Sequence, residues 1–132
     1  MVYRWSITTP LNTLSTSKQT TLLQVCKGVI HQIDIVFPPG SAGLLHLHIN
    51  DALHQVWPYN TGQDFSGHNF TIRFREFIPV LHEPYQFTAY TWNDDDTYDH
   101  ILIIRLGILP IAVIAPWLLT FEERLESALG GI

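Results

Sequence analysis

The stretch that decides the fold is residues 29–49, VIHQIDIVFPPGSAGLLHLHI, in which two alternating apolar runs flank a Pro-Gly turn. Valine, isoleucine and phenylalanine share one face of the first run, and His31 interrupts that face. This period of two is typical of a half-buried β-strand. The turn at residues 38–40 ends the run because proline lacks an N–H and glycine allows positive φ. Leucine and isoleucine then alternate with histidine at residues 45–49. The pattern predicts two strands whose apolar face must be covered by further strands.

The composition indicates a single packed domain. The chain has 132 residues, of which 46% are hydrophobic and 12% aromatic, enough for a core without disulfide or metal staples. Charged residues make up only 14%, against about 25% in ordinary soluble domains, so we expect neighbouring subunits to cover part of the surface. A formal charge of −5 with seven Lys and Arg residues argues against nucleic acid as a direct partner.

Three features bear on the compartment. Cys26 is the only cysteine, so an intramolecular disulfide or a CxxC motif is excluded. The N-terminal residues have no apolar h-region, and we expect no signal peptide. Residues 101–121 are mostly apolar, but Arg105, Pro110 and Pro116 interrupt them and their first half alternates, which argues against a membrane span.

The strand pattern continues along the chain with turns every 8–12 residues. The expected strands are residues 19–26, 29–37, 45–49, 53–57, 70–75, 85–92 and 100–109. We therefore predict an all-β protein, a single antiparallel β-sandwich or jelly roll of about seven or eight strands. Three regions follow: an extended N-terminal arm (1–18), the sandwich (19–110), and an apolar C-terminal segment (111–132) with a short helix.

The two terminal regions are the expected subunit contacts. Residues 1–18 have little apolar periodicity but two early aromatic residues suited to docking. Residues 111–119 would leave an apolar patch in water, and Thr120 with Glu123 forms a capping box for a short helix. We expect deletion of residues 111–132 to leave a folded sandwich that no longer assembles. The expected contact residues are Tyr3, Trp5, Ile111, Val113, Trp117, Leu118, Phe121 and Leu125.

His46 and His48 are the sharpest candidate for a metal site, since residues two apart on a strand point the same way. With Gly40 they fit G-x5-H-x-H and resemble the first half of the cupin metal motif. The cupin family then requires a glutamate, where this chain has Ala52 and Leu53, and the later histidine motif is not visible. The alternative is two histidines on a solvated or interfacial strand face.

The acidic loop is the second metal candidate. Asp94, Asp96 and Asp99 supply the oxygen ligands that Ca²⁺ prefers, but aspartates also make good turns. The sequence has no nucleophile elbow, P-loop, GxGxxG or HExxH motif. We therefore expect a protein that is not an enzyme and needs no cofactor.

A resemblance to phage proteins covers residues 28–110. It rests on the strings GVIHQIDIVFPPGSAGLLHLHI, HQVWPYNTGQDFSG, PYQFTAYTWNDDDTYDH and RLGILP. These resemble a set of small phage and environmental proteins, a likeness that implies no activity. In plan, the chain is also similar to decoration (cement) proteins of tailed-phage capsids. This likeness implies a virion subunit, assembled in the host cytoplasm, whose partners are copies of itself or other virion proteins.

The alternative function is a ligand-binding module of the lectin or carbohydrate-binding kind. Aromatic residues at strand ends and in loops stack on sugars, and the acidic loop would add calcium. The residues concerned are Trp57, Tyr59, Trp92 and Tyr98. Such aromatics also serve as core or interface anchors.

Overall fold

The computed structural model describes residues 1–110 and residue 112, and this part of the chain forms nine β-strands. The strands are β1 (Val2–Thr9), β2 (Gln19–Gln24), β3 (Gly28–Phe37), β4 (Leu45–Asp51), β5 (His54–Trp57), β6 (Phe65–Ser66), β7 (Phe70–Val80), β8 (Gln86–Asn93) and β9 (His100–Leu109). The protein is all-β, as the alternation in the sequence predicts.

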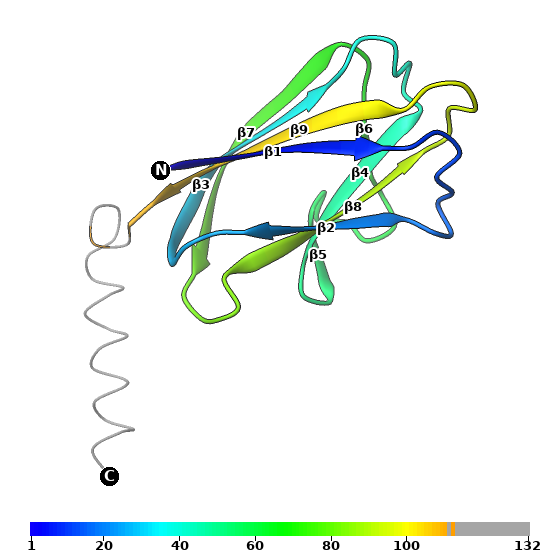
Figure 1. Ribbon diagram of the computed structural model, residues 1–132. Helices are drawn as coiled ribbons and strands as arrows, with labels where there is room; N and C mark the ends of the chain where they lie inside the picture. The colour runs from blue at the N-terminus through cyan, green and yellow to red at the C-terminus, as the bar shows by residue number, and fades with distance from the viewer. Residues whose placement is uncertain (111, 113–132) are drawn as a thin grey trace.

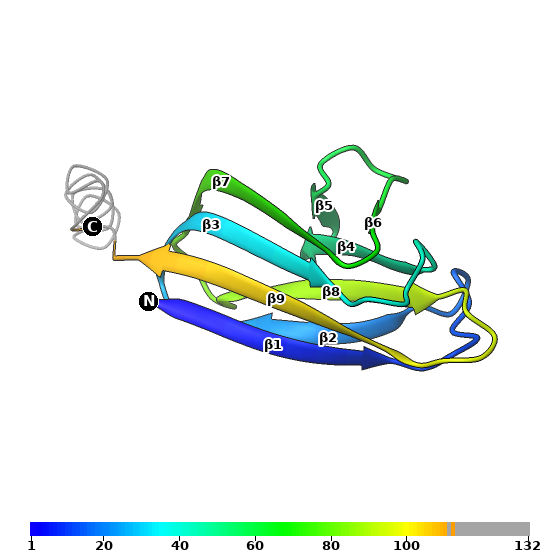
Figure 2. The ribbon, with the colours of Figure 1, turned by 90° about the horizontal axis from the view of Figure 1, so that it is seen from above.

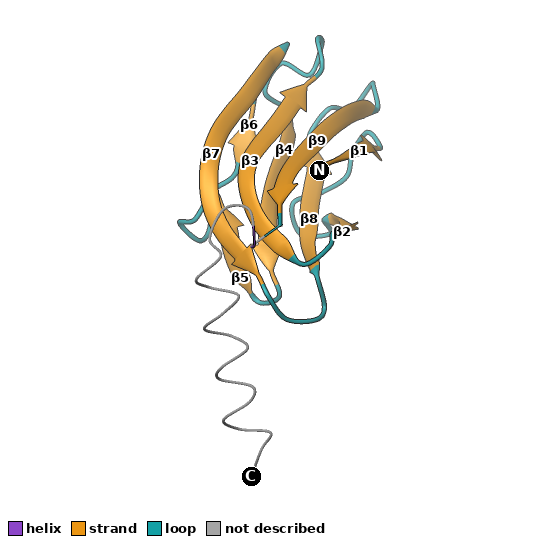
Figure 3. Cartoon of the chain, turned by 90° about the vertical axis from the view of Figure 1, so that its left-hand side faces the viewer, coloured by secondary structure: helices purple, strands orange, loops and turns teal. Residues whose placement is uncertain are grey.

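The strands form two antiparallel sheets (Figure 1). Sheet A has the order β1-β9-β3-β7, and sheet B has the order β2-β8-β4-β5, with the short β6 also paired to β4. The two sheets form two layers (Figure 3), and β1 of sheet A runs beside β2 of sheet B (Figure 2).

The core fills the space between the sheets. Each strand sends alternate side chains inward, because successive residues of a strand face opposite sides. Isoleucines of β3 and β9, such as Ile33 and Ile104, belong to the same cluster as Leu47 of β4 and Phe87 of β8. These four side chains are buried. The arrangement is sandwich-like, with one apolar layer between two sheets.

The predicted N-terminal arm is wrong. Residues 2–9 are strand β1, which pairs with β9 in unbroken register and forms an edge of sheet A. Tyr3 and Trp5 pack against the chain's own core, with their rings stacked at a centroid distance of 5.8 Å, and Ile7 is buried. These three residues alternate with Arg4 and Ser6, the period of two that a half-buried strand shows. Ser6 and Thr8 occupy the solvent side of this edge strand, and threonine is itself a residue that strands favour.

The two runs of the stretch at residues 29–49 form strands as predicted, but they do not pair with each other. β3 lies in sheet A and β4 in sheet B, so the Pro-Gly turn carries the chain between the layers. The pairing register of β3 shifts between Ile30 and Gln32 against both neighbouring strands. His31 therefore interrupts the apolar face because it occupies a β-bulge.

The C-terminal predictions fall outside the described residues. They comprise the helix and the contact residues Ile111, Val113, Trp117, Leu118, Phe121 and Leu125. Within the residues that are described, no helix is long and apolar enough to cross a membrane.

Candidate functional site

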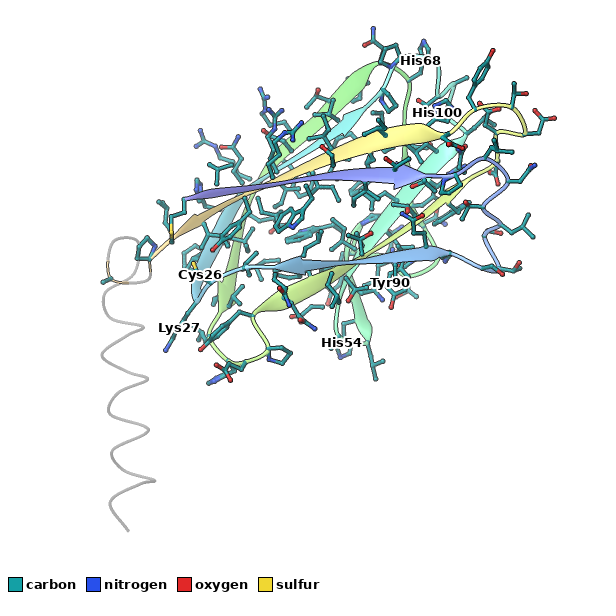
Figure 4. The ribbon with its side chains drawn as sticks, viewed as in Figure 1. Cys26, Lys27, His54, His68, Tyr90 and His100 are labelled. Carbon is teal, nitrogen blue, oxygen red and sulfur yellow. The ribbon has the colours of Figure 1, made fainter. Side chains whose placement is uncertain are left out.

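A cluster of stacked rings lies on the outer face of sheet B. The core takes Leu45 and Leu47 of β4, so the alternating histidines of this strand point outward. His46 lies opposite Trp92 in the register, and His48 lies opposite Tyr90. The two ring pairs stack at centroid distances of 4.9 Å, with interplanar angles of 9° and 19°. With Lys18 these four residues form what we call the ring cluster; Figure 4 labels Tyr90.

His46 lies between two carboxylates. Its Nδ1 is 2.5 Å from Oδ2 of Asp64, which precedes β6, and its Nε2 is 3.0 Å from Oδ2 of Asp94, which follows β8. Both contacts are N–H···O hydrogen bonds only when the imidazole carries a proton on each nitrogen. Through these two contacts the His46 ring joins the β5–β6 loop to the β8–β9 loop.

His48 has a different environment. Its Nε2 is 3.1 Å from Nζ of Lys18, and its Nδ1 is 2.9 Å from Oδ1 of Asn50. A lysine ammonium only donates, so Nε2 accepts, and Nδ1 carries the proton given to the asparagine. Burial, with a smaller contribution from Lys18, lowers the pKa of His48. This ring is a neutral structural histidine.

Lys18 covers the indole of the ring cluster. Its Nζ lies 4.7 Å from the ring centroid of Trp92, in a cation–π contact. Only 9% of the Trp92 surface is exposed. The indole is therefore occupied by this chain's own groups and offers little face to a ligand.

The β8–β9 loop is braced from inside. Asp95 and His100 are buried, and Oδ2 of Asp95 is 2.8 Å from Nε2 of His100, at the start of β9 (Figure 4). Oδ1 of Asp95 accepts the backbone N–H groups of Thr97 and Tyr98. The bond from Thr97, followed by that from His100, lowers the pKa of Asp95.

Asn93 completes this brace. Its amide nitrogen donates to the carbonyls of Thr9 and Tyr98, and its Oδ1 accepts the N–H of Asp95. Buried polar groups with all these partners fix the loop in one conformation.

The structure separates the four aromatic residues suggested for sugar binding. Trp57 is only 2% exposed and belongs to the core, and Trp92 lies in the ring cluster. Tyr59 is 83% exposed and Tyr98 is 66% exposed, and both lie in loops. Only the two tyrosines present their rings to solvent.

The residues suggested as metal ligands are also divided. Asp94 contacts His46, whereas His48 binds Lys18 and Asn50 instead of a carboxylate. In the loop, Asp96 accepts from the hydroxyl of Thr97, and Asp99 accepts from the backbone N–H of Leu11. In the part of the chain that the structure describes, no three His, Cys, Asp or Glu residues are grouped to hold a metal ion. The histidine pair lies outside the core rather than between the sheets.

Sequence reasoning missed several members of these sites. Tyr90 and Trp92 have the same two-residue spacing as His46 and His48. This shared period was the available signal that the two pairs lie on neighbouring strands of one sheet. Nothing local marks Lys18 or Asp64, since each reaches the ring cluster from a different loop. The Asp95–His100 pair was likewise missed.

Comparisons of the chain with protein-family models, with curated proteins and with solved structures found no match.

Proposed function

We propose that this chain is a non-enzymatic structural subunit of a virion, such as a capsid decoration protein, built on a jelly roll. The strand order carries this proposal. If the two-residue β6 is left out, the order β1-β9-β3-β7 and β2-β8-β4-β5 places β1, β3 and β9 in one sheet and their sequence neighbours β2, β4 and β8 in the other. This repeated passage between sheets supports a jelly roll, whose double Greek key alternates in the same way and is a plan found in viral capsid domains, lectins and cupins.

A fold shared by several functions supports a role only by analogy, so the surface must supply a second argument. The outer face of sheet A exposes the apolar side chains of Val2, Phe77 and Ile101. A partner that covered this face would bury these side chains, and burial of apolar surface stabilises such a contact. Residues 111–132 were expected to add contacts, and that part of the proposal stays a prediction.

Sedimentation velocity of the full chain over a wide concentration range tests the proposal, combined with negative-stain microscopy of the most concentrated sample. We expect concentration-dependent association into particles of regular shape. A monomer at every concentration, which also fails to add to purified phage capsids, would contradict a structural role.

A glycan-binding module is the second candidate, and the exposure of Tyr59 and Tyr98 favours it. Calorimetry against a glycan panel, with Ca²⁺ and with EDTA, tests it. We expect binding to be lost in Tyr98→Ala if the loop tyrosine stacks on a sugar, whereas Phe77→Ala serves as a control on the opposite sheet. Absence of binding throughout the panel would contradict the glycan-binding function.

A further inference from the structure

Four of the chain's seven Lys and Arg residues lie on one surface, the outer face of sheet A. Arg4 of β1 lies opposite Arg105 of β9 in the register. Arg105 lies opposite Asp34 of β3, which in turn lies opposite Arg73 of β7. Register partners point to the same side of a sheet, so these residues form one row across all four strands. We call this row, together with Arg75, the arginine face.

The arginine face already holds one carboxylate and has donors for more. Oδ1 of Asp34 is 3.0 Å from Nε of Arg73, and its Oδ2 is 3.5 Å from Nε of Arg105. That Nε of Arg105 is buried and makes no hydrogen bond within the described residues. Arg4 and Arg75 are exposed, and neither pairs with a carboxylate among residues 1–110. Guanidinium groups bind carboxylates through paired N–H donors, so the face suits further acidic side chains.

A small notch adjoins this row. It has a volume of about 90 Å³, and Gly107 and His31 line it beside Asp34 and Arg105. A Cβ atom at Gly107 would lie 2.8 Å from Nε2 of His31. The missing side chain at Gly107 thus lets the His31 ring lie close to the β9 backbone beside Arg105.

The matching anionic surface is the β8–β9 loop of the same chain. Asp94, Asp96 and Asp99 are exposed there together with Tyr98. The buried Asp95 holds the loop from within, so presenting these groups costs little further conformational entropy. A tyrosine ring beside carboxylates suits arginine, which stacks on aromatic faces as well as pairing with acids.

We infer that the arginine face of one copy binds the β8–β9 loop of a second copy, an inference that rests on the proposed structural role. The two surfaces differ, so the contact is heterologous and repeats from copy to copy, forming a ring or a filament. Nucleic acid is the weaker occupant, because a chain with net charge −5 repels phosphate beyond the arginine face.

Charge reversal on each surface tests the pairing, with self-association measured by sedimentation at low and high salt. We expect Arg75→Glu to weaken association about tenfold, and Asp96→Arg to do the same. Both changes in one chain should recover much of the loss, because the opposed charges are restored. Raising the salt concentration should weaken wild-type association.

The matched control is Thr20→Glu with Gln24→Glu, which changes the formal charge by the same amount on exposed positions of β2. This control should associate like the wild type, and all variants should have the same melting temperature as the wild type. An oligomer unaffected by Arg75→Glu overturns this inference alone, whereas a wild-type monomer overturns the structural role as well. If the combined variant shows no recovery, the loop is not the occupant. Binding of duplex DNA at physiological salt that Arg75→Glu abolishes would assign the face to a polyanion instead.

Discussion

The outer faces of the two sheets treat their charges in opposite ways. On sheet B, His46 contacts two carboxylates and Lys18 lies between His48 and the indole of Trp92. On sheet A, arginines outnumber the single Asp34 that lies in their row. A surface whose polar groups are already paired stabilises the fold, whereas a surface with unpaired donors has interactions left for a partner. The comparison therefore predicts that substitutions on sheet B change stability more, and substitutions on sheet A change binding more.

The largest expected loss of stability follows removal of the indole at the centre of the ring cluster. Trp92→Ala deletes the surface on which His46 stacks and over which Lys18 lies. We expect the free energy of unfolding to fall by about 3–5 kcal/mol, as for other large buried aromatics. Chemical denaturation followed by far-UV circular dichroism measures it. Phe77→Ala, on the exposed side of sheet A, should cost about 1 kcal/mol or less; equal losses at the two positions would break the comparison.

Asp34 is the position at which sheet A should behave like sheet B. Asp34→Ala removes the carboxylate between Arg73 and Arg105 and leaves the two guanidinium groups to repel each other. We expect a loss of about 1–3 kcal/mol, larger at low salt than at high salt. Denaturation at two ionic strengths measures both effects. Asp51→Ala, at the exposed end of β4, should stay within about 0.5 kcal/mol of the wild type, and a similar change at both positions would contradict a role for the row.

Much of the fold was predictable because apolar alternation is a local signal. The strands β3, β4, β8 and β9 follow directly from it. The assignment of β1 to an arm was wrong although Tyr3, Trp5 and Ile7 alternate with polar residues, because three apolar positions in a polar segment do not tell which strand they pair with. β7 was expected to end before Pro79, yet it continues to Val80; as an edge strand it has one unpaired side that tolerates proline.

The sites were less predictable, because they depend on which strands become neighbours. His46 was recognised as a ligand type, but its partners Asp64 and Asp94 come from two loops far apart in sequence. The arginine face depends on the register of β1, β9, β3 and β7. No spacing along the chain encodes a row that crosses four strands, so only the pairing reveals it.

His48 makes the stability of sheet B depend on pH. Burial lowers the pKa of His48 in the folded protein. As the pH falls, His48 is therefore protonated in the unfolded chain before it is protonated in the folded one, at about pH 6.5. The contribution of His48 to stability is therefore complete above that pH and declines as the pH falls through about 6.5 toward the lower folded pKa. We expect His48→Gln to flatten the unfolding free energy between about pH 7.5 and 5. Asp95, whose pKa is also lowered, loses its contribution to stability only at more acidic pH, so it does not affect this measurement. If the unfolding free energy of His48→Gln varies with pH as steeply as that of the wild type, His48 is not the titrating group.

The smallest expected effect is that of Lys18, and it links the stability of sheet B to the same titration. Lys18→Met keeps an apolar stem over Trp92 but removes the cation and the hydrogen bond to His48. We expect a loss of about 0.5–1 kcal/mol, typical of an exposed cation–π contact. The charge of Lys18 helps to lower the pKa of His48. Its removal should therefore bring the pKa of His48 in the folded protein closer to that in the unfolded chain. The loss of stability at acidic pH should then be smaller than in the wild type. Arg75→Met is the matched change on sheet A, where the guanidinium lacks a carboxylate partner within the described residues, and its unfolding free energy should change by less than about 0.5 kcal/mol at every pH. Equal losses of unfolding free energy in Lys18→Met and Arg75→Met would mean that a cation with partners stabilises the fold no more than one without a carboxylate partner. That result would contradict the comparison between the two sheets.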